Sequence, residues 1–200
     1  MKTIEPTLDL NRRYSYADYL TWLDDKRREL IDGAIRMLFP APRESHVRTS
    51  GKLHNRLFNY IDSNKGNCRV YYAPFDVRLP KNGECDDNDI YTVVQPDICV
   101  VCDLSKIDER GCLGAPDMIV EIISPSTRRY DYGVKYNLYE RSGIKEYWVV
   151  EPEAKNVTVF TLHENGLYDD GTVYEKNAQI PVMCLPGLTI ELQDLFELNT

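Results

Sequence analysis

Two carboxylates stand inside apolar segments of the chain, where a charged residue is unexpected. Asp97 lies in Val93-Val-Gln-Pro-Asp-Ile-Cys-Val-Val101, and Glu121 interrupts Met118-Ile-Val-Glu-Ile-Ile123. Burying a lone carboxylate is costly, so each of the two needs a partner. A divalent cation is one solution, because Mg²⁺ prefers oxygen ligands and is usually held by one or two carboxylates. A structural salt bridge is the other.

Two more acidic residues fall on predicted strands or at their ends. Glu29 belongs to Glu-Leu-Ile-Asp-Gly, and Asp76 precedes Val-Arg-Leu. With Asp97 and Glu121 they predict an oxygen-rich metal site, since the cysteines and histidines do not form the two pairs that a zinc site of this type needs. Asp76 is the weakest member, because it could also face solvent or pair with Arg78.

The helix predicted after Glu121 carries a lysine, Lys135. Asp131, Lys135 and Tyr139 occupy positions i, i+4 and i+8, so they share one face of a helix. If that helix packs over the sheet, the Lys135 ammonium can reach Glu121, orient an attacking water and stabilise the charge that develops on a phosphate. The alternative is an Asp131–Lys135 pair on the surface. Tyr139 could hydrogen-bond near the site or serve only in packing.

A predicted helix over 45–62 has a histidine, His46, near its start and carries basic side chains. His46 could contact the scissile phosphate or its leaving group, or be an ordinary residue at a helix end. Arg48, Lys52 and Arg56 form a basic stripe beside the apolar one. Residues 43–56 therefore carry a local charge of +3, as do residues 126–145.

The pattern of apolar residues predicts the elements that position these side chains. Asp32-Gly33 between two apolar runs predicts a hairpin with Glu29 on its first strand. A strand, a helix and a second strand over 116–150 have the length of a βαβ unit, which implies a mixed sheet with at least one parallel pair. We predict an α/β (α+β) fold in a single domain over 1–200, with C-terminal hairpins. The predicted helices cover 16–26, 45–62 and 127–142, and the predicted strands cover 69–73, 76–79, 93–102, 116–123, 145–150 and 157–162.

Composition limits the class of protein. The 200 residues suffice for one domain with a sizeable core, and 42% are hydrophobic, as in ordinary globular chains. The net charge of −8 argues against a protein that coats nucleic acid by bulk electrostatics, although it permits a local basic cleft. No apolar run could span a bilayer and no secretory signal is evident, so we expect a cytoplasmic protein.

Six cysteines are irregularly spaced. Without an export signal, reduced thiols are expected rather than a disulfide framework. Cys99 and Cys102 form a CxxC, but a second such pair is missing, and both lie in a strand-like run. Burial as small apolar residues is therefore the expected role for them.

Several segments together resemble a known family. They are Glu-Leu-Ile-Asp-Gly from Glu29, Val-Gln-Pro-Asp ending at Asp97, Pro-Asp-Met-Ile-Val-Glu-Ile-Ile-Ser-Pro-Ser-Thr around Glu121, Asp-Tyr-Gly-Val-Lys ending at Lys135, and Gly-Ile-Lys-Glu-Tyr-Trp-Val-Val. Over about residues 14–195 the chain resembles the Uma-two family, whose members are described as "putative restriction endonucleases" and belong to the PD-(D/E)XK nuclease-like superfamily.

The resemblance implies a metal-dependent phosphodiesterase with a restriction-endonuclease-like core. Asp97 and Glu121 would bind Mg²⁺, with Mn²⁺ able to substitute, and Glu29 would be the acidic residue from the N-terminal part. The superfamily usually has a lysine two positions after the second acid, where this chain has Ile123. Lys135 on the following helix would take its place.

Two classes of function therefore stand beside each other. The first is a Mg²⁺-dependent endonuclease that acts on DNA, with Glu29, Asp97, Glu121 and Lys135 as catalytic residues. The second is a catalytically inactive binding or assembly module that keeps the nuclease fold, which the acidic net charge and Ile123 would favour. A homodimer is compatible with both.

Overall fold

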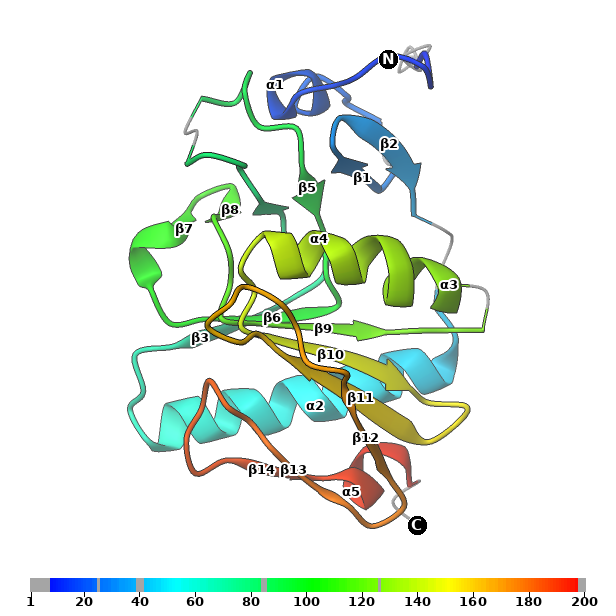
Figure 1. Cartoon of the computed structure of the whole chain (residues 1–200), viewed down its shortest axis with the longest axis vertical. Helices are drawn as coiled ribbons and strands as arrows, with labels where there is room; N and C mark the ends of the chain where they lie inside the picture. Colours follow the sequence, from blue (N-terminus) through cyan, green and yellow to red (C-terminus); the bar gives the residue numbers. More distant parts are fainter. Residues whose placement is uncertain (1–7, 25, 39–41, 84–85, 126, 198–200) are drawn as a thin grey trace. The chain divides into compact units, whose positions relative to one another are not determined.

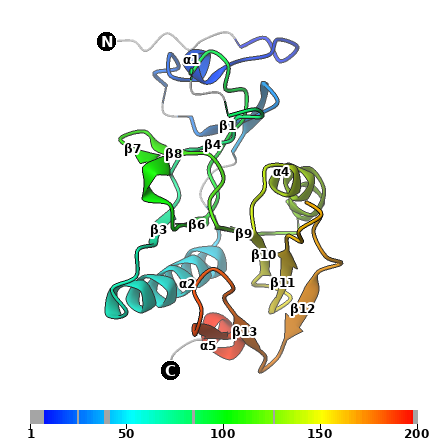
Figure 2. The same ribbon diagram turned by 60° about the vertical axis from the view of Figure 1, so that its left-hand side comes forward.

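The computed structural model describes residues 8–24, 26–38, 42–83, 86–125 and 127–197. Backbone contacts divide the chain into two compact units. The first unit comprises residues 1–41, 75–95 and 106–115, and the second comprises residues 42–74, 96–105 and 116–200. Figure 1 labels most of the elements of both, and Figure 2 also labels β4. The assignment of the whole chain to a single domain stays a prediction.

The first unit is built on a mixed sheet with the strand order β2-β1-β5-β4-β8-β7. Asp32 and Gly33 join β1 to β2 with φ angles of 51° and 81°, as a tight hairpin turn with two left-handed residues requires. The predicted hairpin is thus confirmed, with Glu29 on its first strand. The elements are α1 (Tyr16–Tyr19), β1 (Arg28–Ile31), β2 (Ala34–Met37), β4 (Val77–Arg78), β5 (Val93–Val94), β7 (Ile107–Asp108) and β8 (Gly111–Leu113).

The predicted first helix over 16–26 is wrong in length. The α-helix α1 ends at Tyr19, although Ser15 and Asp18 form the expected capping box. Trp22 turns back toward the preceding segment, and its ring lies 5.2 Å from that of Tyr14 and 5.6 Å from that of Tyr19. Packing of these aromatic rings outweighs the local helical pattern.

The second unit contains a six-stranded sheet with the order β12-β11-β10-β9-β6-β3 and a separate hairpin, β13-β14. The strands β9 and β10 are parallel, with Glu121 opposite Val149, which confirms the predicted βαβ unit. Its strands are β3 (Arg69–Tyr72), β6 (Ile98–Val101), β9 (Met118–Ile122), β10 (Glu146–Glu151), β11 (Asn156–Thr161), β12 (Thr172–Glu175), β13 (Gln179–Pro181) and β14 (Thr189–Glu191).

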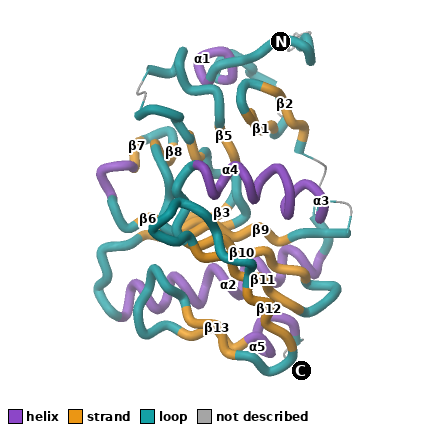
Figure 3. The backbone as a smooth tube through the Cα atoms, viewed as in Figure 1, coloured by secondary structure: helices purple, strands orange, loops and turns teal. Residues whose placement is uncertain are grey.

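Helices lie on both faces of this sheet. The helix α2 (Glu44–Ser63) lies on one side of β9–β11, and α4 (Tyr136–Arg141) lies on the other (Figure 2). The segments α3 (Arg128–Tyr130), the π-helical turn η2 (Asp131–Lys135) and α4 follow one another without a break (Figure 3). The short helix α5 (Leu192–Phe196) follows β14, and the 3₁₀ turn η1 (Leu104–Lys106) follows β6.

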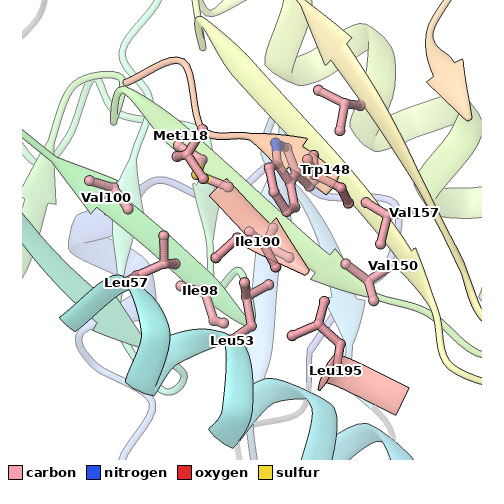
Figure 4. Packing of buried hydrophobic residues seen from close by; sticks show 14 of the residues in the cluster. Leu53, Leu57, Ile98, Val100, Met118, Trp148, Val150, Val157, Ile190 and Leu195 are labelled. Atoms are coloured by element: carbon pink, nitrogen blue, oxygen red, sulfur yellow. The ribbon is translucent and has the colours of Figure 1, made fainter. Parts of the chain in front are cut away.

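The main core lies between the sheet and the helices α2 and α5 (Figure 4). Alternate residues of the strands point into it, such as Ile98 on β6, Val120 on β9 and Trp148 on β10. Because neighbouring residues of a strand point to opposite faces, Glu121 belongs to the other face, which α4 covers. The sheet thus separates a dry core from the face that carries Glu121.

The predicted strand over 93–102 is in fact two strands in different units. The strand β5 pairs with β1 and β4, whereas β6 pairs with β3 and β9. Gln95 and Pro96 separate them, and Pro96 has no N–H to donate to a ladder. This break is why Asp97 lies at the beginning of a strand rather than inside one.

The expectation that the cysteines are reduced is wrong for one pair. Cys68 and Cys102 form a disulfide between β3 and β6, next to the paired residues Arg69 and Val101. Cys99 is a buried free thiol, as expected. Cys85 lies outside the described residues. Among the helices that the structure describes, none is both long and apolar enough to cross a membrane.

Candidate active site

Asp97 directly precedes β6, and Glu121 lies on β9, the neighbouring strand of the same sheet. Ile98 on β6 pairs with Val120 on β9 in an antiparallel ladder. One position further along each strand, Asp97 stands opposite Glu121. The register therefore brings the backbones of the two residues next to each other at the end of β9, while their side chains bind groups on different elements, His46 on α2 and Lys135 on η2.

Two groups from different elements hold the Asp97 carboxylate. The backbone N–H of Ile122 donates to Oδ2 at 2.7 Å, and His46 Nε2 lies 3.1 Å from Oδ1. His46 stands in the first turn of α2. Burial lowers the pKa of His46, but the hydrogen bond and the charge of Asp97 outweigh it, so the pKa is raised above 6.5. His46, whose role the sequence left open, thus joins the site.

Two buried donors converge on one oxygen of Glu121. Lys135 Nζ donates to Oε1 at 2.8 Å, and the Tyr139 hydroxyl donates to the same atom at 2.6 Å. Lys135 and Glu121 are each 5% exposed, and Tyr139 is fully buried. Charge-assisted hydrogen bonds in such a dry setting are strong and orient the carboxylate firmly.

The π-helical turn η2 brings Lys135 to this place. Lys135 is its last residue, and Tyr139 follows one turn later on α4. Turns of this kind are rare and often occur at functional sites. Asp131 is also buried, so the alternative of an exposed Asp131–Lys135 pair is wrong.

Glu29 and Asp76 belong to the first unit. Glu29 is fully buried, and its Oε1 accepts the backbone N–H of Gln95 at 2.9 Å. The Asp76 carboxylate accepts from Gln95 Nε2 at 2.8 Å and from the hydroxyls of Tyr16 and Tyr19 at 3.4 Å. The participation of Glu29 in one site with Asp97 stays a prediction.

Asp76 does not use the partner that the sequence suggested. The guanidinium of Arg78 binds Asp108 Oδ1 at 2.6 Å. Burial raises the pKa of Asp76, although its hydrogen bonds oppose the rise. Asp76 is thus an internal hydrogen-bond acceptor that holds two tyrosines.

A second Pro-Asp pair occupies the other end of the same two strands. Asp117 precedes β9 as Asp97 precedes β6, and its Oδ2 accepts the backbone N–H of Cys102 at 2.8 Å. Its cation is Lys145, at 2.7 Å, whose side chain is 72% exposed. No acidic residue opposes Asp117, because Val101 occupies that position in the register. Asp117 therefore resembles Asp97 in backbone geometry but lacks the facing carboxylate.

The basic stripe on α2 is not a free surface. Lys52 Nζ donates to the carbonyls of Asp194 and Glu197 at 2.7 and 2.6 Å, and Arg48 donates to the carbonyl of Phe196 at 3.2 Å. Arg56 forms an ion pair with the Asp194 carboxylate. The stripe thus binds the C-terminal end of α5. The local charge of +3 that the sequence shows over residues 43–56 is therefore partly neutralised within the protein.

The candidate site offers carboxylate oxygens, which are the ligands that Mg²⁺ prefers. Within the described ranges, no group of three or more His, Cys, Asp or Glu side chains is arranged to hold a metal ion. Mg²⁺ is commonly held by one or two carboxylates, with water and substrate phosphate completing its shell. Asp97 and Glu121 fit that pattern.

The second unit is a mixed sheet with helices on both faces, an α/β arrangement in which a strand carboxylate, Glu121, binds a helical lysine, Lys135. The chain belongs to the Uma2 family, described as "Putative restriction endonuclease", whose profile matches residues 16–193. It is 26% identical over 157 residues to the uncharacterized protein slr1290 of Synechocystis sp., covering 77% of each chain.

A crystal structure shows the same fold. It is that of a putative nuclease belonging to DUF820 from Anabaena variabilis, and the TM-score is 0.71 at 19% identity. The match covers 92% of this chain and 97% of that chain. The predicted family and fold class are thereby confirmed.

Proposed function

We propose that the protein is a Mg²⁺-dependent endonuclease that hydrolyses phosphodiester bonds in DNA. The observation that carries this proposal is the convergence of Lys135 and Tyr139 on one oxygen of Glu121, which lies on the strand next to the one that Asp97 precedes. Membership of a family described as "Putative restriction endonuclease" supports the same reaction. Glu29 is proposed as a further catalytic acid from the N-terminal part of the chain.

Each residue has a role that follows from its contacts. Asp97 and Glu121 would hold Mg²⁺, which when bound supplies positive charge to the scissile phosphate and to the attacking water. Lys135 and Tyr139 fix the Glu121 carboxylate, and the Lys135 ammonium orients the water and offsets charge on the phosphate. His46 and the N–H of Ile122 fix Asp97 in the same way.

Cleavage of plasmid and single-stranded DNA with Mg²⁺ or Mn²⁺ tests the proposal. Asp97→Asn, Glu121→Gln and Lys135→Ala should each lower the rate at least about 100-fold, because the reaction depends on charge at this point. Asp117→Asn is the matched control, since Asp117 accepts an equivalent backbone hydrogen bond at the other end of the same strands. It should retain the wild-type rate.

Two results would contradict the proposal. If wild type and the three site variants degrade DNA equally, the activity comes from elsewhere. If wild type binds DNA with no divalent cation and never cleaves it, the chain is a binding module that has kept the nuclease fold.

A further inference from the structure

Two exposed cations, Arg129 and Lys155, lie at the edge of the second unit where β9 and β10 end. Arg129 stands in α3, directly after β9, and Lys155 lies in the turn between β10 and β11 (Figure 1). Both side chains are exposed. Within the described part of the chain, neither side chain has a hydrogen bond or an ion pair. Since Glu121 lies near the end of β9, these cations are on the same edge of the sheet as the candidate active site.

The other arginines at this edge are neutralised by the chain itself. Arg128 lies 3.3 Å from Glu151 Oε2, and Arg43 forms an ion pair with Glu153. These glutamates end β10 and begin the turn that contains Lys155. The acidic residues of the turn are therefore already matched, so Arg129 and Lys155 carry uncompensated positive charge beside a site proposed to cleave a polyanion.

We propose that Arg129 and Lys155 bind backbone phosphates of the DNA strand next to the scissile phosphate. This inference rests on the proposed function and names the part of the surface that holds its substrate. Cations that contact phosphates position nucleic acid without reading its sequence, and each releases counterions on binding. The surface therefore provides affinity that depends on salt and not on base sequence.

Two other exposed cations of the same unit are matched controls. Arg69 lies in β3 opposite Val101, at the other end of the sheet from Asp97. Lys65 follows the C-terminal end of α2 and has a left-handed φ of 49°, close to the 53° of Lys155. Alanine at these positions removes the same two charges, one of them at a matching left-handed residue, at the other end of the sheet from Asp97.

Fluorescence anisotropy with a labelled DNA duplex, in Ca²⁺ in place of Mg²⁺ and over a series of KCl concentrations, measures the effect in the full chain. Arg129→Ala with Lys155→Ala should weaken binding about tenfold or more, and the slope of log affinity against log salt should fall by about 2. Arg129→Lys should retain most of the affinity. Arg69→Ala with Lys65→Ala should bind as wild type does.

The outcomes separate this inference from the proposed catalysis. Equal losses in the two double variants, no loss in the Arg129–Lys155 variant, or no DNA binding by wild type would overturn the inference. Cleavage by wild type with unchanged binding by the Arg129–Lys155 variant would overturn it while the proposed function stands. Selective loss of binding in a chain that never cleaves DNA would support the surface and contradict the catalysis.

Discussion

At the residue scale, one oxygen of Glu121 receives two buried donors, and this arrangement affects both the stability of the fold and the proposed binding of Mg²⁺. The ammonium of Lys135 compensates the carboxylate charge, and the hydroxyl of Tyr139 limits its rotation. A buried ion pair is costly to break on one side only, because the remaining charge stays in a dry environment.

Replacing Lys135 with methionine should therefore destabilise the protein strongly. We expect the free energy of unfolding to fall by about 3–5 kcal/mol, measured by urea denaturation. Lys145→Met is the control, because Lys145 binds a strand carboxylate at a similar distance but is exposed, and it should cost no more than about 1 kcal/mol. Equal effects of the two substitutions would show that Glu121 is not held in a dry site.

Tyr139→Phe should weaken metal binding while the protein stays folded. Loss of a group that orients a metal ligand typically costs about 10- to 100-fold in metal affinity. Calorimetric titration with Mg²⁺ or Mn²⁺ measures this. Tyr147→Phe is the control, since the Tyr147 hydroxyl, also fully buried, donates to the Asp131 carbonyl at 3.2 Å instead. If Tyr139→Phe binds the metal with unchanged affinity, Tyr139 does not position Glu121 for metal binding.

Spacing along the chain could predict only part of the site. The helical spacing of Lys135 and Tyr139 was enough to place both on the face toward Glu121. The contact between His46 and Asp97 joins residues 51 positions apart, so it depends on how α2 packs and leaves no local signal. The chain also contains two Pro-Asp pairs, and the strand register separates them by placing Glu121 opposite Asp97 alone.

At the scale of elements, the helix α2 contains an internal glycine, Gly51, whose replacement should stabilise the protein. An added methyl group at Gly51 would meet nothing within 4 Å, and the residue is exposed. Gly51→Ala should raise the free energy of unfolding by about 0.5–1 kcal/mol, because alanine loses less backbone entropy in a helix. Thermal and urea unfolding both measure this.

The hairpin glycine provides the opposite case. Gly33 has a φ of 81°, and an added Cβ would lie 2.9 Å from the Cβ of Arg13. Gly33→Ala should therefore cost about 1–3 kcal/mol. A gain at Gly33, or a loss at Gly51, would contradict the backbone conformations described for these elements.

Elements were predictable where local chemistry decides and not where packing does. The turn at Asp32-Gly33 and the βαβ pattern were sufficient to predict the hairpin and the parallel pair. The first helix is shorter than predicted because Trp22 packs back on Tyr14. The basic stripe of α2 is present, but its side chains bind the end of α5, which the sequence did not indicate. A hydrophobic or charged stripe shows that a face is used, but not what it contacts.

At the scale of the whole molecule, stability depends on pH, and the titration of Glu146 contributes to that dependence. Burial raises the pKa of Glu146 above 4.5, although hydrogen bonds from Trp148 Nε1 at 2.8 Å and the Cys184 N–H at 3.1 Å oppose the rise. The folded chain therefore binds this proton more tightly than the unfolded chain. The contribution of protonated Glu146 to the free energy of unfolding is therefore complete below pH 4.5, and it is lost as the pH rises through the pKa of Glu146 in the folded chain.

The stability of wild type relative to Glu146→Gln should consequently decline as the pH rises from acid toward neutral. Urea unfolding at several pH values measures both proteins, and the difference between the two curves isolates Glu146 from the other carboxylates. A difference that is flat, or that grows with pH, would mean that the carboxylate is already charged in the folded state.

The attachment of α5 to α2 has a consequence for experiments on the whole molecule. Two backbone carbonyls and a carboxylate of residues 194–197 bind the side chains of Lys52 and Arg56, and the carbonyl of Phe196 binds Arg48. A chain shortened before Leu192 would expose these three cations together with apolar core residues such as Leu53. Any gain in DNA binding by such a shortened chain would therefore come from surface that the intact protein covers.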